Sequence, residues 1–245
     1  MAERLVHLIS RKTIFPLVKK LFNISCKKLE KIRPDKSYIF AANHQGALDL
    51  LVLSAIIVPH TNRHLSIMIH RNWYYLFYLL FSRWKAVKVN PDEEGGGTAI
   101  EKGVELLTKG HNVLIFPEAS EVGVLRKEML RAFTGVIRLA IMSKKPIIPL
   151  GIKGSHEAWK FPQPILPQLS NQLLKDPLSI FYFNFSYPVQ VTFGNQISFE
   201  RYYHIDLSKK TEKNRKLLRR LVTELMIKIG KLSDQAYKHD LEYLK

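Results

Sequence analysis

A histidine and an aspartate stand five positions apart between two apolar stretches of the sequence. They are His44 and Asp49, in the segment FAANHQGALDLL at residues 40–51. Helical steps of about 100° would place two side chains at this spacing on different faces, so they can meet only if a helix begins between them. Gly46 would permit such a turn, because glycine adopts backbone angles that other residues avoid. We therefore expect His44 at the end of a strand and Asp49 in the first turn of the next helix.

The chemistry of such a pair depends on the hydrogen bond between the two side chains. A carboxylate that accepts from one imidazole nitrogen fixes the tautomer, and the opposite nitrogen can then act as a base. Because the chain contains no GxSxG nucleophile motif, the proton to be removed is predicted to belong to a substrate hydroxyl group. The other interpretation from these residues alone is a hydrogen-bonded structural histidine beside an aspartate that caps a helix.

A second polar segment follows an apolar strand signal. NVLIF at residues 112–116 is followed directly by Pro117, Glu118, Ala119 and Ser120. Parallel α/β folds bind ligands in the loops outside the carboxyl ends of their strands. His44 is also expected at such an end, so both polar segments occupy positions suited to a functional site.

The elements that must hold these residues alternate along the chain. Strands are predicted at 37–42, 64–70, 85–89, 112–116, 146–154 and 188–194, and helices at 48–58, 72–81, 98–110, 133–145 and 209–235. This order predicts a single α/β domain with a mostly parallel sheet covered by helices. Pro59 is expected to end the first helix, Thr98 to cap the third and Gly110 to end it. Residues 155–187 lack periodicity and are predicted to be an irregular insertion.

The N-terminus combines apolar and basic residues at helical spacing. The apolar set is Leu5, Val6, Leu8, Ile9, Ile14, Phe15, Leu17, Val18, Leu21 and Phe22, and the basic set is Arg4, Arg11, Lys12, Lys19 and Lys20. This pattern is typical of a helix lying in a membrane interface, which Pro16 would bend or divide. An ordinary surface helix packed on its own domain is the alternative. We assign 1–30 to an amphipathic membrane-contact segment and 31–245 to the catalytic domain.

Charge and composition limit the functional classes to which this protein can belong. Lys and Arg number 38 against 21 Asp and Glu, giving a net charge of +17 and a bias toward polyanions. A nucleic-acid-binding protein would explain this charge and the basic helix at 209–235, but it leaves the two polar segments unexplained. The single Cys26 excludes an internal disulfide, and His60 and His64 lack the HExxH context of a zinc hydrolase. The longest apolar run, residues 73–81, is too short to span a membrane, so a cytoplasmic protein peripheral on the membrane is expected.

Four sequence blocks have an order and spacing that identify a family. They are NHQGALD at 43–49, FPEAS at 116–120, FTG at 133–135 followed by RLA at 138–140, and PIIP at 146–149. In these blocks the sequence resembles the glycerolipid acyltransferases of the lysophosphatidic-acid acyltransferase type, with their NHxxxxD and FPEG[ST] motifs.

This resemblance implies transfer of an acyl group from acyl-CoA or acyl carrier protein to a hydroxyl of a lysophospholipid-like acceptor. His44 would be the general base, oriented by Asp49, and backbone N–H groups near the start of the following helix would stabilise the developing oxyanion. No metal or redox cofactor is implied, and the expected partners are membrane lipids and the acyl donor. The acceptor-binding residues it implies are Pro117, Glu118, Ser120 and Gly135.

Two departures from the family pattern leave the acceptor open. The family usually has an arginine where Asn90 and Pro91 stand here, and a second arginine where this chain has Glu121. Their loss should weaken phosphate binding, because charge-assisted hydrogen bonds to phosphate are the strong ones. A catalytically weak or inactive family member therefore remains an alternative. Basic residues that could contact a phosphate instead are Lys88, Arg126, Lys127 and Arg131.

Overall fold

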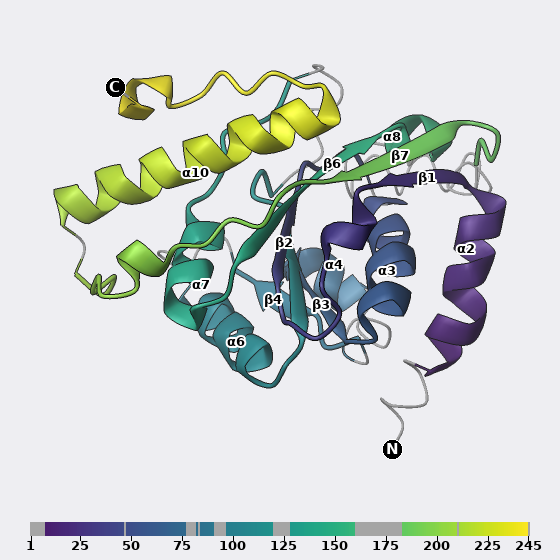
Figure 1. Cartoon of the computed structure of the whole chain (residues 1–245), viewed down its shortest axis with the longest axis horizontal. Helices are drawn as coiled ribbons and strands as arrows, with labels where there is room; N and C mark the ends of the chain where they lie inside the picture. Colours follow the sequence, from purple (N-terminus) through teal and green to yellow (C-terminus); the bar gives the residue numbers. More distant parts are fainter. Residues whose placement is uncertain are drawn as a thin grey trace.

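The structure, a computed structural model, is built around one sheet with helices on both faces (Figure 1). It describes residues 8–46, 48–76, 82, 84–90, 97–119, 128–159, 183–209 and 211–244. The strands are β1 (Asn23–Lys27), β2 (Ile39–Ala42), β3 (Leu65–His70), β4 (Val87–Val89), β5 (Asn112–Ile115), β6 (Ile147–Lys153) and β7 (Pro188–Phe193). In the described part of the chain they form a seven-stranded sheet in the order β1-β7-β6-β2-β5-β3-β4.

The sheet is mostly parallel, as predicted. β2 pairs in parallel with β5 and β6, and β3 pairs in parallel with β5 and β4. β7 runs antiparallel to β6, and the edge strand β1 runs parallel to β7. Strand β1 was not predicted, because the residues of this edge strand are almost all exposed and carry no buried alternation.

Two groups of helices cover the sheet. Helices α2 (Phe15–Leu21) and α3 (Leu48–Thr61) lie on one face, and α6 (Gly97–Thr108), α7 (Gly135–Ser143) and α10 (Glu212–Ser233) lie on the other (Figure 1). Shorter elements are η1 (Ser10–Ile14), η2 (Leu29–Lys31), α4 (Arg71–Leu76), α8 (Ser155–Ala158), η6 (Glu200–Tyr202) and η7 (Leu241–Leu244). The predicted α/β architecture is confirmed.

Successive residues of the central strands enter two separate cores. Phe40 and Leu114 pack with the side chains of α2 and α3, whereas Ile39 and Val113 pack with those of α6, α7 and α10. All four side chains are fully buried. This arrangement explains why the strands read as continuous apolar runs, since a parallel sheet covered on both faces has no solvated side.

Some predicted helix boundaries were wrong. Helix α3 continues through Pro59 to Thr61, because the ring removes one backbone donor but the buried side chains of the last turn still pack. Helix α6 begins at Gly97, so Thr98 lies inside its first turn and is not the capping residue. Gly110 does follow the end of α6, with a φ of +84°. The predicted helix 72–81 and insertion 155–187 are described only in part, as α4, α8 and residues 183–187.

The N-terminal helix presents one apolar row to the core and another to solvent. Residues 8–21 are helical, with a π-helical turn over Ser10–Ile14 just before Pro16. The inner row is buried against the domain and consists of Phe15, Val18 and Phe22. The outer row is 37–54% exposed and consists of Leu8, Ile9, Ile14, Leu17 and Leu21. Together with β1, the inner row makes much of residues 1–30 part of the folded domain.

Candidate active site

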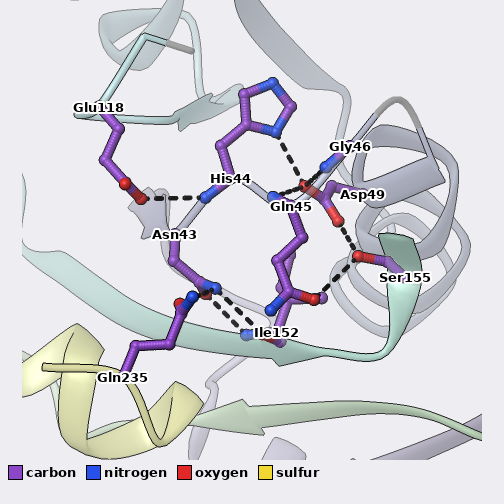
Figure 2. Close-up of polar contacts among 9 residues, drawn as sticks. All are labelled: Asn43, His44, Gln45, Gly46, Asp49, Glu118, Ile152, Ser155 and Gln235. Atoms are coloured by element: carbon purple, nitrogen blue, oxygen red, sulfur yellow. Dashed lines mark hydrogen bonds and ion pairs between the residues drawn. The ribbon is translucent and has the colours of Figure 1, made fainter. Parts of the chain in front are cut away.

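His44 and Asp49 meet at the carboxyl end of the central strand β2. The strand ends at Ala42 and α3 begins at Leu48, so Asp49 lies in the first turn of the helix, as predicted. His44 Nδ1 lies 2.8 Å from Asp49 Oδ2, with the carboxylate fully buried and the imidazole 19% exposed. Figure 2 shows the other ring nitrogen, Nε2, pointing away from Asp49. A carboxylate in this position can only accept, so Nδ1 carries the hydrogen and Nε2 is the basic nitrogen.

The Asp49 carboxylate also closes the turn before α3. The backbone N–H groups of Gln45 and Gly46 donate to Oδ2 over 2.6 and 2.9 Å (Figure 2). The turn does form at Gly46, but this residue does not adopt a positive φ, and an added Cβ would lie 4.0 Å from His156 Cα, so the turn does not depend on backbone angles special to glycine. Because Asp49 occupies both amides, these two groups do not supply the oxyanion donors expected at the start of the helix.

Glu118 connects the His44 segment to the loop that follows β5. Its Oε1 accepts from the backbone N–H of His44 over 3.1 Å, and its Oε2 accepts from Leu130 N–H over 2.6 Å. In the same loop, the Pro117 carbonyl accepts from Phe133 N–H over 2.8 Å, which joins the loop to the residues just before α7. The Phe116 ring stacks on the His44 imidazole with 4.3 Å between ring centroids. The two polar segments therefore lie in contact at the carboxyl ends of β2 and β5.

Burial raises the pKa of Glu118 from 4.5 to about 7, although its two backbone donors favour the ionised form. The unfolded chain releases this proton at lower pH than the folded chain, so the stability associated with Glu118 is complete below pH 4.5 and is lost as pH rises toward 7. Between pH 5 and pH 8 the wild type should lose roughly 2 to 3 kcal/mol more unfolding free energy than Glu118→Gln. Urea denaturation at both pH values measures this difference, and equal losses would contradict it.

Asn43 fixes the start of the His44 segment to two other parts of the chain. Its side chain accepts from Ile152 N–H over 2.8 Å and donates to the Ile152 carbonyl over 3.0 Å, which ties it to β6. The same amide donates to Gln235 Oε1 over 2.8 Å, just beyond the end of α10 (Figure 2). The backbone at His44 is thus fixed in two ways. Glu118 accepts from the His44 N–H, and the side chain of the preceding Asn43 is bonded to Ile152 and Gln235.

A serine that sequence analysis did not single out completes the cluster. Ser155 follows β6 and donates from its Oγ to Asp49 Oδ1 (Figure 2). The side chains of His44, Glu118 and Ser155 therefore come from the carboxyl ends of three neighbouring strands, β2, β5 and β6. No local pattern around Ser155 could have indicated this contact, because it joins residues 106 positions apart.

The remaining predicted site residues lie in different places. Lys88 is exposed on the edge strand β4, with its Nζ 2.9 Å from Tyr75 Oη. Arg131 forms a double hydrogen bond with Asp240 in the C-terminal segment, and this pair lowers the pKa of Asp240. Gly135 begins α7, where an added Cβ would meet no atom within 4 Å. Ser120, Arg126 and Lys127 lie outside the described residues.

Asn90, which stands where the family pattern has an arginine, has a basic neighbour from another element. Arg71 at the start of α4 donates from Nη1 to Asn90 Oδ1 over 3.2 Å. Sequence analysis did not single out Arg71, since its guanidinium reaches this position from 19 residues away. The position of the other missing arginine, Glu121, lies outside the described residues.

The basic residues of α10 that suggested nucleic-acid binding are engaged by carboxylates. Arg215 and Lys216 lie 2.7 and 3.9 Å from Glu212, and Arg220 lies 3.0 Å from Glu224. Arg219 pairs with Asp240 at 3.2 Å. These pairs cancel part of the positive charge of the helix, which disfavours a role as a phosphate-binding stripe.

The described ranges contain neither a metal-binding cluster nor a membrane-spanning helix. In that part of the chain, no cluster of three or more His, Cys, Asp or Glu side chains could hold a metal ion. His60 Nε2 lies 2.8 Å from the Ile32 carbonyl, and the His64 ring stacks on His111 with 5.0 Å between centroids. No helix among these residues combines the length and the apolar character needed to cross a bilayer.

Comparison with known proteins identifies sequence and fold relatives. The sequence profile of the Acyltransferase family matches residues 23–153. A 1-acyl-sn-glycerol-3-phosphate acyltransferase from Bacillus subtilis (strain 168) is 24% identical over 127 residues, which are 51% of this chain and 60% of that relative. The crystal structure of the 1-acyl-sn-glycerophosphate (LPA) acyltransferase PlsC from Thermotoga maritima has a similar fold, with a TM-score of 0.58 at 15% identity. That similarity covers 94% of this chain and 83% of the other.

Proposed function

The chain belongs to the acyltransferase family, and we propose that it moves a fatty acyl group from an acyl thioester to a hydroxyl of a lysophospholipid-like acceptor. The observation that carries this proposal is the 2.8 Å contact between His44 Nδ1 and the buried Asp49 carboxylate inside the matched region. This contact leaves Nε2 as the nitrogen that can accept a proton. The proposed donors are acyl-CoA and acyl carrier protein, whose thioesters are already activated.

In the proposed reaction, His44 Nε2 removes the proton from the acceptor hydroxyl as that oxygen attacks the thioester carbonyl carbon. The new carbon–oxygen bond forms and the carbon–sulfur bond breaks, and the imidazolium then returns the proton to the departing thiolate. Asp49 orients the ring and stabilises its charged form. Glu118 would contribute through position, since both of its oxygens hold backbone segments that flank the histidine.

The acceptor is proposed to be a lysophospholipid, with a phosphate contact weaker than in relatives that have both arginines. The Bacillus subtilis relative is named for a 1-acylglycerol-3-phosphate acceptor, which supports the lysophosphatidic-acid type. Among the four basic candidates, Arg131 already pairs with Asp240, so Lys88, Arg126 and Lys127 are the stronger proposals for a phosphate contact. Arg71 joins them because it lies beside Asn90.

Purified protein incubated with labelled acyl-CoA or acyl carrier protein and a panel of lysolipids tests this function. Mass spectrometry of the extracted lipids should show a diacyl product that is absent without protein. The preference for lysophosphatidic acid over uncharged monoacylglycerol, measured as the ratio of their kcat/KM values, should be smaller than in family members that bind the phosphate with both arginines. Binding of donor and acceptor without product would instead support a catalytically inactive family member.

We further propose that the protein sits peripherally on the cytoplasmic face of a membrane through its N-terminal helix. In the outer apolar row, Leu8, Leu17 and Leu21 are 42–54% exposed. Lys12, Lys19 and Lys20 lie on the same helical segment, and each basic residue near anionic lipid adds roughly 1 kcal/mol of attraction. Apolar side chains beside basic ones favour a lipid interface over plain solvent.

Replacing Leu8, Leu17 and Leu21 together with glutamine should weaken binding to phosphatidylglycerol vesicles by at least about tenfold, because each leucine forfeits about 1 kcal/mol of partial burial. Vesicle co-sedimentation at low and high salt measures this effect, and wild-type binding should weaken with salt without vanishing. Deleting residues 1–22 would be a poorer test, since it removes the buried Phe15, Val18 and Phe22. The control is Leu241→Gln with Leu244→Gln, at 43% and 39% exposure. Equal loss in both variants would contradict an N-terminal contact.

A further inference from the structure

The Asp49 carboxylate has hydrogen-bond donors on both of its oxygens. Oδ2 accepts from the His44 ring and from the backbone N–H groups of Gln45 and Gly46, while Oδ1 accepts from Ser155 Oγ (Figure 2). Three of these donors come from the same turn, within five residues of Asp49. Ser155, the first residue of α8, is the donor that comes from outside that turn, so it determines how the carboxylate is rotated relative to the turn.

The direction of the hydrogen bonds around Ser155 follows from the chemistry of its neighbours. An ionised carboxylate can only accept, so the hydroxyl hydrogen goes to Asp49. The Ser155 oxygen also lies 3.3 Å from Gln45 Oε1, and since its single hydrogen goes to Asp49, an amide turned by 180° would place its NH₂ group there as a donor to Ser155. Ser155 has no exposed surface and Gln45 has 8%. The Asp49 carboxylate is therefore the common acceptor of a buried network, with Ser155 donating to one oxygen and the His44 ring donating to the other.

The backbone before Ser155 brings its side chain to this place. Gly154 has a φ of +81°, and a Cβ added there would lie 2.2 Å from the Pro188 carbonyl oxygen. Glycine is therefore required where β6 turns, passing close to β7, into the short helix α8. Because β6 is hydrogen-bonded to β2, the turn carries Ser155 to the strand end where Asp49 and His44 meet.

We propose that Ser155 is a positioning residue for the acyl transfer proposed above, acting on the reaction through Asp49 and His44. Ser155 orients Asp49 Oδ1, which keeps Oδ2 aligned with His44 Nδ1 and holds the imidazole in the tautomer whose Nε2 is basic. The hydrogen bond from the Ser155 hydroxyl also stabilises the negative charge of the carboxylate. The expected change in reaction rate rests on the proposed function, whereas the expected effect of Ser155 on the His44 ring does not.

Removal of the hydroxyl has a definite effect on the pH profile. In Ser155→Ala the Asp49 carboxylate loses a donor, so its negative charge acts more strongly on the imidazolium form of His44. The proton on His44 is then held more tightly, and the base becomes available only at higher pH. The acid limb of the kcat/KM profile should move upward by at least about 0.5 pH unit.

The kinetic test compares Ser155→Ala, Ser155→Cys and Ser66→Ala. Ser155→Ala should lower kcat by about 10- to 100-fold with little change in the acceptor KM, since a hydrogen bond to a buried charge is lost. Ser155→Cys, with a weaker donor, should fall between alanine and wild type. Ser66→Ala is the matched control, because Ser66 is equally buried and its Oγ has no polar partner among the described residues. An unchanged kcat and acid limb in Ser155→Ala would overturn the proposal.

Nuclear magnetic resonance of ¹⁵N-histidine-labelled full-length protein provides a readout that needs no substrate. In the wild type, His44 should carry its hydrogen on Nδ1 over the neutral pH range. In Ser155→Ala the midpoint of its titration should move upward or its tautomers should mix, while Ser66→Ala leaves both unchanged. If the wild type acylates no lysolipid, the proposed function fails, but this measurement still decides the link between Ser155 and His44. Identical His44 spectra in the wild type and Ser155→Ala would exclude that link.

Discussion

Replacing His44 with alanine should lower acyl transfer by about 100- to 10,000-fold, because the proton acceptor for the attacking hydroxyl is removed. The imidazole is 19% exposed and stacks on Phe116, so the fold should survive the loss of its packing. The measurement is the rate of labelled diacyl product formation, together with a thermal denaturation curve to verify folding. His204→Ala, at an exposed position, serves as the control.

Asp49→Asn should cost at least about 100-fold in the same assay. The asparagine oxygen can accept from only some of the donors that now surround the carboxylate, and its NH₂ group would face another donor. The His44 tautomer would then no longer be fixed.

If His44→Ala keeps more than about a tenth of wild-type activity, the general base lies elsewhere, because removal of a general base costs about 10²–10⁴-fold.

The largest effect on stability is expected from Gly151→Ala in β6. A Cβ added at Gly151 would lie 2.2 Å from the Leu232 carbonyl carbon and 2.4 Å from Ser233 N, both backbone atoms of α10. No side-chain rotation can relieve such a clash, so the end of α10 must move away from the sheet. That movement would disturb the buried Leu225, Met226 and Ile229. We expect a loss of about 3 kcal/mol or more in unfolding free energy.

Urea denaturation of Gly151→Ala beside Gly97→Ala tests this expectation. Gly97 begins α6, and an added Cβ would meet no atom within 4 Å there. Because alanine favours helix, Gly97→Ala should leave stability unchanged or raise it by up to about 1 kcal/mol. A Gly151→Ala protein as stable as the wild type would mean that α10 packs less closely on β6 than the structure shows.

The sequence predicted the parts of the fold that local patterns determine. Strands such as 112–116 and helices such as 133–145 were found because the period of their apolar residues is set within the element itself. The meeting of His44 with Asp49 was also predictable, since both residues lie in one turn and a helix had to begin between them. The expected end of α3 at Pro59 was wrong, because the packing of the last turn of the helix outweighed the intrinsic backbone preference of proline.

The parts that could not be predicted depend on contacts between distant segments. Ser155 reaches Asp49 across 106 positions, and Gln235 reaches Asn43 across 192. Ser155 begins a segment without periodicity and Gln235 stands at the end of a predicted helix, so the role of each becomes visible only when the spatial arrangement of the strands and helices is known. β1 escaped prediction for a related reason, since an exposed edge strand is defined by its partner β7 more than by its own sequence.

The pairing of β1 with β7 has a consequence for how the chain folds during synthesis. The partner of residues 23–27, at 188–193, is made about 165 residues later in synthesis. Until then the backbone N–H and C=O groups of the strand that will bond to β7 are unpaired, and they lie beside two apolar rows of the N-terminal helix. Such a segment is prone to aggregation or to pairing with the wrong strand. The site itself is completed even later, when Gln235 arrives to bind Asn43. The nascent chain therefore carries an incomplete sheet edge while the residues between β1 and β7 are made, and closure of that edge by β7 is a long-range and hence slow event in folding.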